Sequence, residues 1–255
     1  MRGRHQFPVL SGRPAAGSTV GDGDWDDVKV DPDLFAALLR ATRPHANPHD
    51  RETTDFLAAL GSELVPAKST NDIRPSALHM TSGNQKFLKL LRDLARSLDA
   101  EDWTCKEASG PPAEAFREAL FGDWQCADQF SSLGYDPATE AIYALSDAAP
   151  ADAKPWSTRA AVWLAVEALP LFPCFPVAGR LHTRGFDKSG TRFRWPVWNA
   201  PLSLPVIRTL LGLTLFAPEW SAITLASYGI CAVFESERVT IGKGYGQFRP
   251  GIRVS

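Results

Sequence analysis

The chain has 255 residues, of which 44% are hydrophobic and 22% charged; it has no apolar run of 18 residues, and its first residues lack the apolar region of a secretory signal, so none is expected. This composition is typical of a globular protein with a real core and excludes a membrane protein, so a cytoplasmic location is expected. The net charge of −2 hides an asymmetry, because residues 1–153 hold 15 basic and 24 acidic side chains, whereas residues 154–255 hold 12 and 5.

The charge asymmetry has two interpretations. A basic half can meet an external anion, or the two halves can attract each other. The first 30 residues are rich in Gly, Asp and Ser and are predicted to be disordered or peripheral. Residues 31–255 are predicted to form one domain, with an acidic helical part at 31–153 and a basic, strand-rich part at 154–255.

The acidic part contains segments with helical spacing of apolar residues or with helix-end signals, at 31–42, 53–61, 84–99 and 112–122. The third is the clearest, because Phe87, Leu90, Leu91 and Leu94 follow the i, i+3, i+4, i+7 rule. Ser82 and Gln85 are predicted to form a capping box in front of it. A turn and a strand at 141–145 are expected to follow.

The basic part begins with an apolar helix at 156–169, after which a proline-rich run forces the chain to leave extended. Strands are expected at 180–186 and 191–198, on either side of an Asp-Lys-Ser-Gly hairpin loop. A short helix or packed turn at 201–213 follows, and residues 221–246 are expected to supply two strands joined near residues 235–237. Helices mostly first and strands mostly last predict an α+β fold.

No set of residues has the spacing of a known catalytic or metal site. The four cysteines are far apart, and the spacing of His45 and His49 suits a metal on a helix, but a proline beside each histidine disfavours a helix there. The motifs G-x-S-x-G and H-E-x-x-H are absent. We therefore expect no catalytic residue, metal or cofactor, and free thiols in a reducing compartment.

Residues 180–198 combine cationic side chains, a histidine and aromatic rings around a turn signal. Arginine forks match phosphate oxygens, each phosphate contact releases counterions, and exposed rings can stack on unpaired bases. A glycine-rich basic loop at 242–248 adds support. The predicted nucleic-acid-binding residues are Arg180, His182, Arg184, Arg192, Arg194, Trp195, Lys243 and Arg249. An ordinary exposed hairpin, with its tryptophan packed in a wall, is the alternative interpretation, and an anion-binding catalytic pocket is a third.

The face on which the arginines lie depends on the hairpin register, because a shift of one residue exchanges the two faces of a strand. A four-residue loop pairs Phe186 with Thr191 and separates the arginines. A five-residue loop pairs Phe186 with Arg192 and gathers three arginines on one face. Both registers stay open.

Several segments resemble, in their order, the Csb-type protein of type I-G (formerly I-U) CRISPR effector complexes. They are SALHMTSGNQKFLKLLRDL, SLGYDPATEAIYAL, AAVWLAVEALPLFPCFPVAGRLHTRGF, FRWPVW and PLSLPVIRTLL, which together span about residues 75–215. The chain differs from that family at its start, where Gly and Asp replace an apolar segment.

The resemblance implies a non-catalytic, divergent large subunit of an RNA-guided antiviral complex. Its implied partners are the crRNA and target DNA, other subunits of the complex, and a helicase–nuclease that it helps recruit; no membrane is involved. Protein subunits in such systems read backbone and duplex shape, while base pairing carries the sequence information. The alternatives are a pure scaffold without nucleic-acid contact, and a metal-dependent nuclease.

Overall fold

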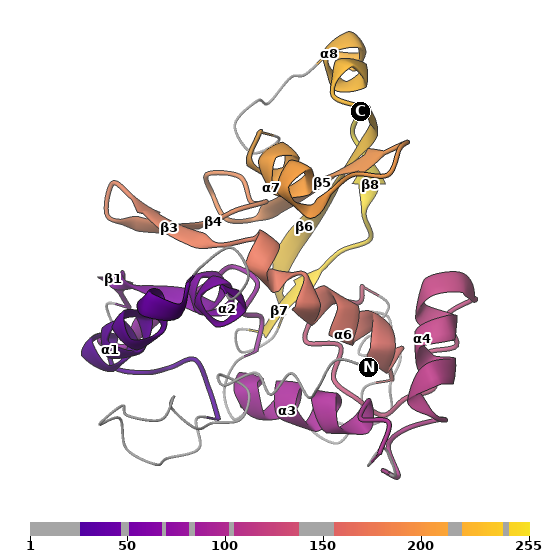
Figure 1. The fold of residues 1–255 in the computed structure, drawn as a ribbon, viewed down its shortest axis with the longest axis horizontal. Coiled ribbons are helices and arrows are strands. Elements are labelled where there is room, and N and C mark those ends of the chain that lie inside the picture. The colour runs from indigo at the N-terminus through magenta and orange to yellow at the C-terminus, as the bar shows by residue number, and fades with distance from the viewer. Residues whose placement is uncertain are drawn as a thin grey trace.

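A computed structural model describes residues 26–46, 51–67, 70–81, 85–101, 105–137, 156–213, 221–241 and 245–255 (Figure 1). The fold is α+β, as predicted, with the longer strands in the C-terminal half and α1 to α4 in the N-terminal half. In these ranges we find no helix with the length and hydropathy that a membrane crossing requires.

The N-terminal half follows the predicted helices closely. Its elements are α1 (Pro32–Thr42), η1 (Arg43–His45), α2 (Glu52–Leu60), β1 (Gly61–Pro66), β2 (Ile73–Pro75), α3 (Phe87–Ser97) and α4 (Pro112–Phe121). Asp31 caps α1 by accepting hydrogen bonds from the backbone N–H groups of Asp33 and Leu34. The residue that caps α3 is Lys86, without a side-chain bond, and Ser82 lies outside the described residues. The β1–β2 pair was not predicted.

The C-terminal half contains α6 (Arg159–Glu167), η2 (Leu169–Leu171), β3 (Cys174–Val177), β4 (Arg180–Thr183), β5 (Arg192–Trp198), α7 (Leu204–Leu213), α8 (Ala222–Ser227), β6 (Ile230–Ile241), β7 (Tyr245–Phe248) and β8 (Ile252–Arg253). The prediction that residues 221–246 form two strands joined near residues 235–237 was wrong. The first part of this range is the helix α8, and β6 runs without a break through residues 235–237. The strand predicted at 141–145 lies outside the described residues.

The predicted hairpin between 180–186 and 191–198 does not form as a continuous ladder. β4 pairs with β3 instead, through a tight turn at Ala178 and Gly179, both of which have positive φ. β5 pairs with β6, which also pairs with β7 and β8. Between the two predicted strands, the described contact is one isolated bridge, Phe186 to Phe193, so neither predicted register is present.

Aromatic burial explains this third register. Phe186 is buried in the main core, and the Phe193 ring packs against Phe172, Phe186 and Phe248 at centroid distances of 5.1 to 5.4 Å. The Phe193 ring occupies the space where a side chain at Gly185 would be. Long-range packing of rings therefore sets the register, because a shift would move Phe193 out of the core.

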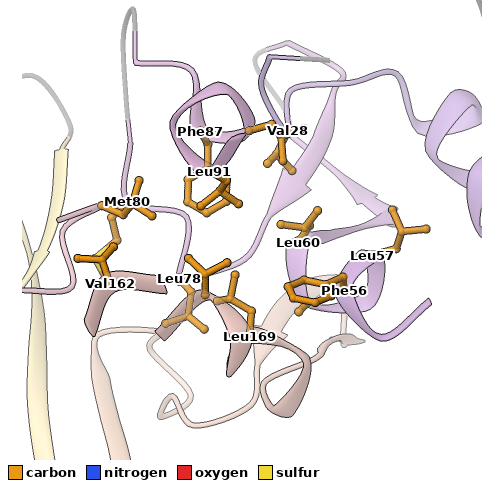
Figure 2. Close-up of a cluster of buried hydrophobic side chains, with 14 of the residues drawn as sticks. Val28, Phe56, Leu57, Leu60, Leu78, Met80, Phe87, Leu91, Val162 and Leu169 are labelled. Carbon is orange, nitrogen blue, oxygen red and sulfur yellow. The ribbon is translucent and has the colours of Figure 1, made fainter. Parts of the chain in front are cut away.

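The main core joins helices from both halves of the chain (Figure 2). α3 contributes Phe87 and Leu91, and α6 and η2 contribute Val162 and Leu169 from the other half. Val28 is also fully inside, and the N–H group of Ile73 donates to the carbonyl of Val30. Asp27 and Val28, near the end of the segment predicted to be peripheral, are therefore buried, whereas Lys29 is exposed; residues 1–25 lie outside the described ranges.

A buried ion pair ties the two halves together at the start of α6. Asp128 and Arg159 are 2% and 0% exposed, and the guanidinium of Arg159 donates to the Asp128 carboxylate and to the carbonyl of Gly110. Asp128 also accepts from the N–H groups of Ser109 and Arg159, at 2.8 and 3.0 Å. Removing either charged partner would leave the other charge buried and uncompensated.

Replacing Asp128 with alanine is expected to lower the free energy of unfolding by about 3–5 kcal/mol, because it leaves a buried guanidinium without its counter-charge. Urea denaturation measures this loss. The control is Asp123→Ala in the exposed loop before it, which should change stability by about 0.5 kcal/mol or less. Equal effects of the two substitutions would contradict the importance of the junction.

Replacing Gly185 with alanine is expected to be more damaging than the same change at Gly190. Both have positive φ, +91° and +75°, so both lose about 1–2 kcal/mol to backbone strain. A Cβ at Gly185 would lie 2.3 Å from the Phe193 ring, whereas a Cβ at Gly190 meets nothing within 4 Å. The difference in unfolding free energy should therefore be about 1–3 kcal/mol further against Gly185→Ala; two equal losses would show that the ring is not confined there.

Candidate nucleic-acid interface

The arginines of β5 face glutamates on β6. The register places Arg192 opposite Glu237 and Arg194 opposite Glu235. Both guanidiniums contact Glu235, Arg194 at 2.6 Å and Arg192 at 3.4 Å. One carboxylate thus pairs with two arginines, and these three side chains together keep a net positive charge. The Arg192 side chain is 59% exposed and that of Arg194 30%, so Arg192 is the more available of the two.

Trp195 lies in a row of rings rather than on an open surface. Its ring stacks between Phe193 and Phe234, at centroid distances of 5.8 and 5.9 Å. Gly251 gives it room, since a Cβ there would lie 2.7 Å from the indole. The half-buried Trp195 side chain therefore packs in a wall of the protein, as the alternative interpretation expected. A nucleic-acid base could contact only the part of the ring that Phe193 and Phe234 leave exposed.

The β3–β4 hairpin carries Arg180 and His182 away from β5. Arg180 is exposed beside the tip of this hairpin, which projects from the body of the protein (Figure 1). It has no ion pair with any described residue. His182 is half-buried and stacks on its cross-strand partner Phe175, at 5.9 Å between centroids. Cross-strand stacking of this kind stiffens the hairpin that presents Arg180.

The turn before β5 is built around the Asp187 carboxylate. It accepts hydrogen bonds from the Ser189 hydroxyl at 2.8 Å and from the N–H groups of Thr191 and Arg192 at 3.0 and 3.1 Å. Burial raises the pKa of Asp187, but these hydrogen bonds outweigh it and hold that pKa below its usual value. Lys188, which the sequence interpretation did not select, stands exposed on this turn.

Arg184 follows β4 at the base of the hairpin, and its N–H donates to the carbonyl of Pro173. Its side chain is half-buried and makes no hydrogen bond or ion pair to a described residue. Burial, and then the positive charge of nearby Arg208, lower the pKa of this guanidinium. Arg184 is therefore a cation held beside another cation, which is an unfavourable arrangement in the absence of an anion.

The remaining predicted residues belong to the end of the chain. Arg249 contacts Glu237 at 3.5 Å, and both side chains are more than half exposed, so this pair is nearly neutral and weakly held. Lys243 lies outside the described residues.

The structure therefore distributes the predicted cations instead of gathering them on one face. Arg180, Arg184, Lys188 and Arg192 follow one another from the hairpin tip to the start of β5, and Arg194 and Arg249 are tied to glutamates. Both interpretations of the charge asymmetry apply in part. Two cations of the basic half, Arg159 and Arg208, pair with carboxylates of the acidic half.

A buried polar cluster around His79 was not predicted. The Nε2 atom of His79 lies 3.3 Å from Asp27 Oδ1 and 3.1 Å from the Thr81 hydroxyl. Burial raises the pKa of Asp27, but the hydrogen bond and charge of His79, the N–H of Val28 and the charge of Lys29 together lower it by more. The pKa of Asp27 therefore lies below its usual value. Both contacts use one ring nitrogen, so the cluster does not align a hydroxyl, an imidazole and a carboxylate for proton transfer. It fastens residues 26–30 to the core.

Two further observations concern the described residues. A cavity of about 420 Å³ lies between α3 and residues 105–107 and 129–131, and none of the predicted binding residues lines it. Within the described ranges, no three His, Cys, Asp or Glu side chains are grouped closely enough to hold a metal ion.

Comparisons with family models, with curated proteins and with solved structures found no match for this chain.

Replacing Asp187 with asparagine is expected to destabilise the protein near neutral pH and to have little effect in acid. A carboxyl whose pKa is lowered by folding stabilises the folded state above its unfolded pKa of about 3.9, and this contribution is lost as the pH falls through the folded pKa. Urea denaturation at several pH values between 7 and 3 measures the difference. Asp123→Asn is the control for loss of an exposed carboxylate. A difference that stays constant across this range would contradict the assignment.

Proposed function

We propose that this protein is a non-catalytic subunit of a type I CRISPR RNA-guided effector complex, in which the C-terminal part contacts the phosphate backbone of the bound nucleic acid. The observation that carries the proposal is the run of under-compensated cations from Arg180 through Arg184 and Lys188 to Arg192. The resemblance over residues 75–215 supplies the kind of complex.

The geometry suits contact with a backbone better than readout of bases. Arg180 is exposed at the start of β4 and Lys188 on the turn before β5, and Arg192 keeps most of its side chain in solvent even though it touches Glu235. Such groups can meet successive phosphates, whose contacts give affinity without sequence preference. Sequence recognition is then left to the guide RNA.

Large exposed apolar side chains support assembly with other subunits. Phe121 and Trp124 at the end of α4 are 86% and 54% exposed, and Ile223 on α8 is 84% exposed. α4 and α8 lie far apart in the molecule (Figure 1). Exposed rings and branched side chains of this size are typical of protein interfaces, and two separate positions suit contacts with two neighbours.

The second candidate function is a scaffold that binds proteins alone. The same exposed apolar side chains support it, and so do the ion pairs that Arg194 and Arg249 make within the protein. The two candidates differ in one property, which is whether the run of cations contributes to nucleic-acid binding.

Replacing Arg180, Lys188 and Arg192 together with alanine is expected to weaken binding to labelled single-stranded DNA by tenfold or more, as an order of magnitude. The slope of log affinity against log salt should fall by about 2, since about 0.7 is lost for each phosphate contact. Fluorescence anisotropy across a salt titration measures both quantities.

The control removes the same charge from the acidic part, by replacing Arg43, Arg74 and Arg96 with alanine; these three side chains are also exposed. It should leave the affinity and the slope nearly unchanged. Absence of DNA binding by the wild-type protein, combined with capture of partner proteins that survives nuclease treatment, would favour the scaffold. Equal effects of the two triple substitutions would remove this surface from the proposal.

A further inference from the structure

Two arginines from separate segments bind one buried carboxylate. Asp55 on α2 is 8% exposed. Arg51 donates to both oxygens of Asp55 at 2.9–3.1 Å, and Arg208 on α7 donates to Oδ2 at 2.9 Å. One negative charge therefore serves at least two positive ones.

Arg184 reaches the same region from the end of β4. Ala59, one helical turn after Asp55 on α2, accepts a weak hydrogen bond from the Cys174 thiol, at 3.8 Å. Cys174 pairs across the β3–β4 ladder with Thr183, the residue before Arg184. The side of α2 that holds Asp55 therefore lies against the base of the hairpin.

The group carries an excess of positive charge. Arg51 and Arg208 share one carboxylate, and the half-buried side chain of Arg184 has no hydrogen bond or ion pair to a described residue. The Nε atom of Arg208 is buried without a hydrogen-bond acceptor. Burial, and then the positive charge of Arg208, lower the pKa of Arg184, so the two guanidiniums repel each other.

We propose that Arg184 and Arg208, positioned by Asp55, bind a phosphate group at the junction of α2, α7 and the β3–β4 hairpin. A phosphate would cancel the repulsion and give two guanidinium forks the planar oxygen pairs that they match. Asp55 orients Arg208 and keeps the site from binding two anions. The site does not use Arg180, Lys188 or Arg192, so it stands whether or not those three side chains bind DNA.

The phosphate can be free, or it can belong to a nucleic-acid strand, and the experiment separates these sources. Thermal unfolding is followed with sodium phosphate against sodium chloride at equal ionic strength, and then with a thymidine dinucleotide that carries or lacks a 5′-phosphate. If the site binds phosphate with a millimolar Kd, a ligand concentration tenfold above that Kd is expected to raise the Tm of the wild-type protein by about 2–4 °C.

Arg184→Gln should abolish the increase in Tm, because it removes one fork. Arg117→Gln is the matched control, since it makes the same substitution at an exposed position on α4, far from the β3–β4 hairpin (Figure 1), and should keep the increase. If Arg184→Gln lowers Tm in chloride by itself, Arg184→Lys decides: it retains the charge, and phosphate affinity measured by calorimetry should still fall several-fold for lack of a fork.

An increase with inorganic phosphate, lost in Arg184→Gln, assigns the site to free phosphate or a phosphate monoester. An increase with both dinucleotides alone, with the same dependence on Arg184, assigns it to a backbone phosphodiester. No increase with any ligand, or an equal increase in Arg184→Gln, overturns the proposal. If the protein binds DNA but phosphate does not raise its Tm, this site is ruled out and the proposed function stands. If phosphate raises the Tm but the protein does not bind DNA, the site stands and the proposed function is ruled out.

Discussion

The buried pair of Asp128 and Arg159 holds the acidic helical part against the basic strand-rich part, and other contacts of the protein depend on that union. Both side chains lie out of water, and the carboxylate also accepts from Ser109 and from the first N–H group of α6. Because α6 sends Val162 and Val166 into the core that α3 completes, the ion pair and the apolar core stabilise the same arrangement. A carboxylate at a helix N-terminus is further favoured by the helix dipole.

The same shortage of carboxylates shapes the rest of the basic half. Residues 154–255 have 12 cations and five carboxylates, so the carboxylates are shared. Glu235 serves two arginines of β5, and Arg208 uses Asp55 from the acidic half. Arg180, Arg184 and Lys188, along the β3–β4 hairpin and the turn that follows it, are among the described cations without a carboxylate side chain as partner, as are Arg238 and Arg253. This surplus, rather than a single arginine face, is the physical basis of the proposed contact with a polyanion.

The aromatic side chains of β5 pack within the protein, whereas the arginines beside them in sequence suggested that they would stack on nucleic-acid bases. Phe193, Trp195 and Phe234 form a row that continues into the core through Phe186 and Phe248. This row fixes β5 on β6 and leaves the arginines on the opposite face. Stacking with bases is therefore a smaller element of the proposed function than contact with phosphates, and the apolar residues at the ends of α4 and α8 are the better candidates for partner contacts.

Local pattern was enough to predict the α+β class and the helices of the N-terminal half, although it missed α8. In α3, for example, Phe87, Leu91 and Leu94 recur at helical spacing, and this periodicity depends only on nearby residues. Of the residues of 180–198 that the sequence predicted to bind nucleic acid, Arg180 and Arg192 are exposed, whereas His182, Arg184, Arg194 and Trp195 are half-buried. Tertiary structure alone decided the partner of each strand, the inclusion of Val28 in the core, and the use of Glu235 and Asp55 as counter-charges. These choices depend on which distant groups become neighbours once Phe186 and Phe193 are buried, and no local spacing encodes that.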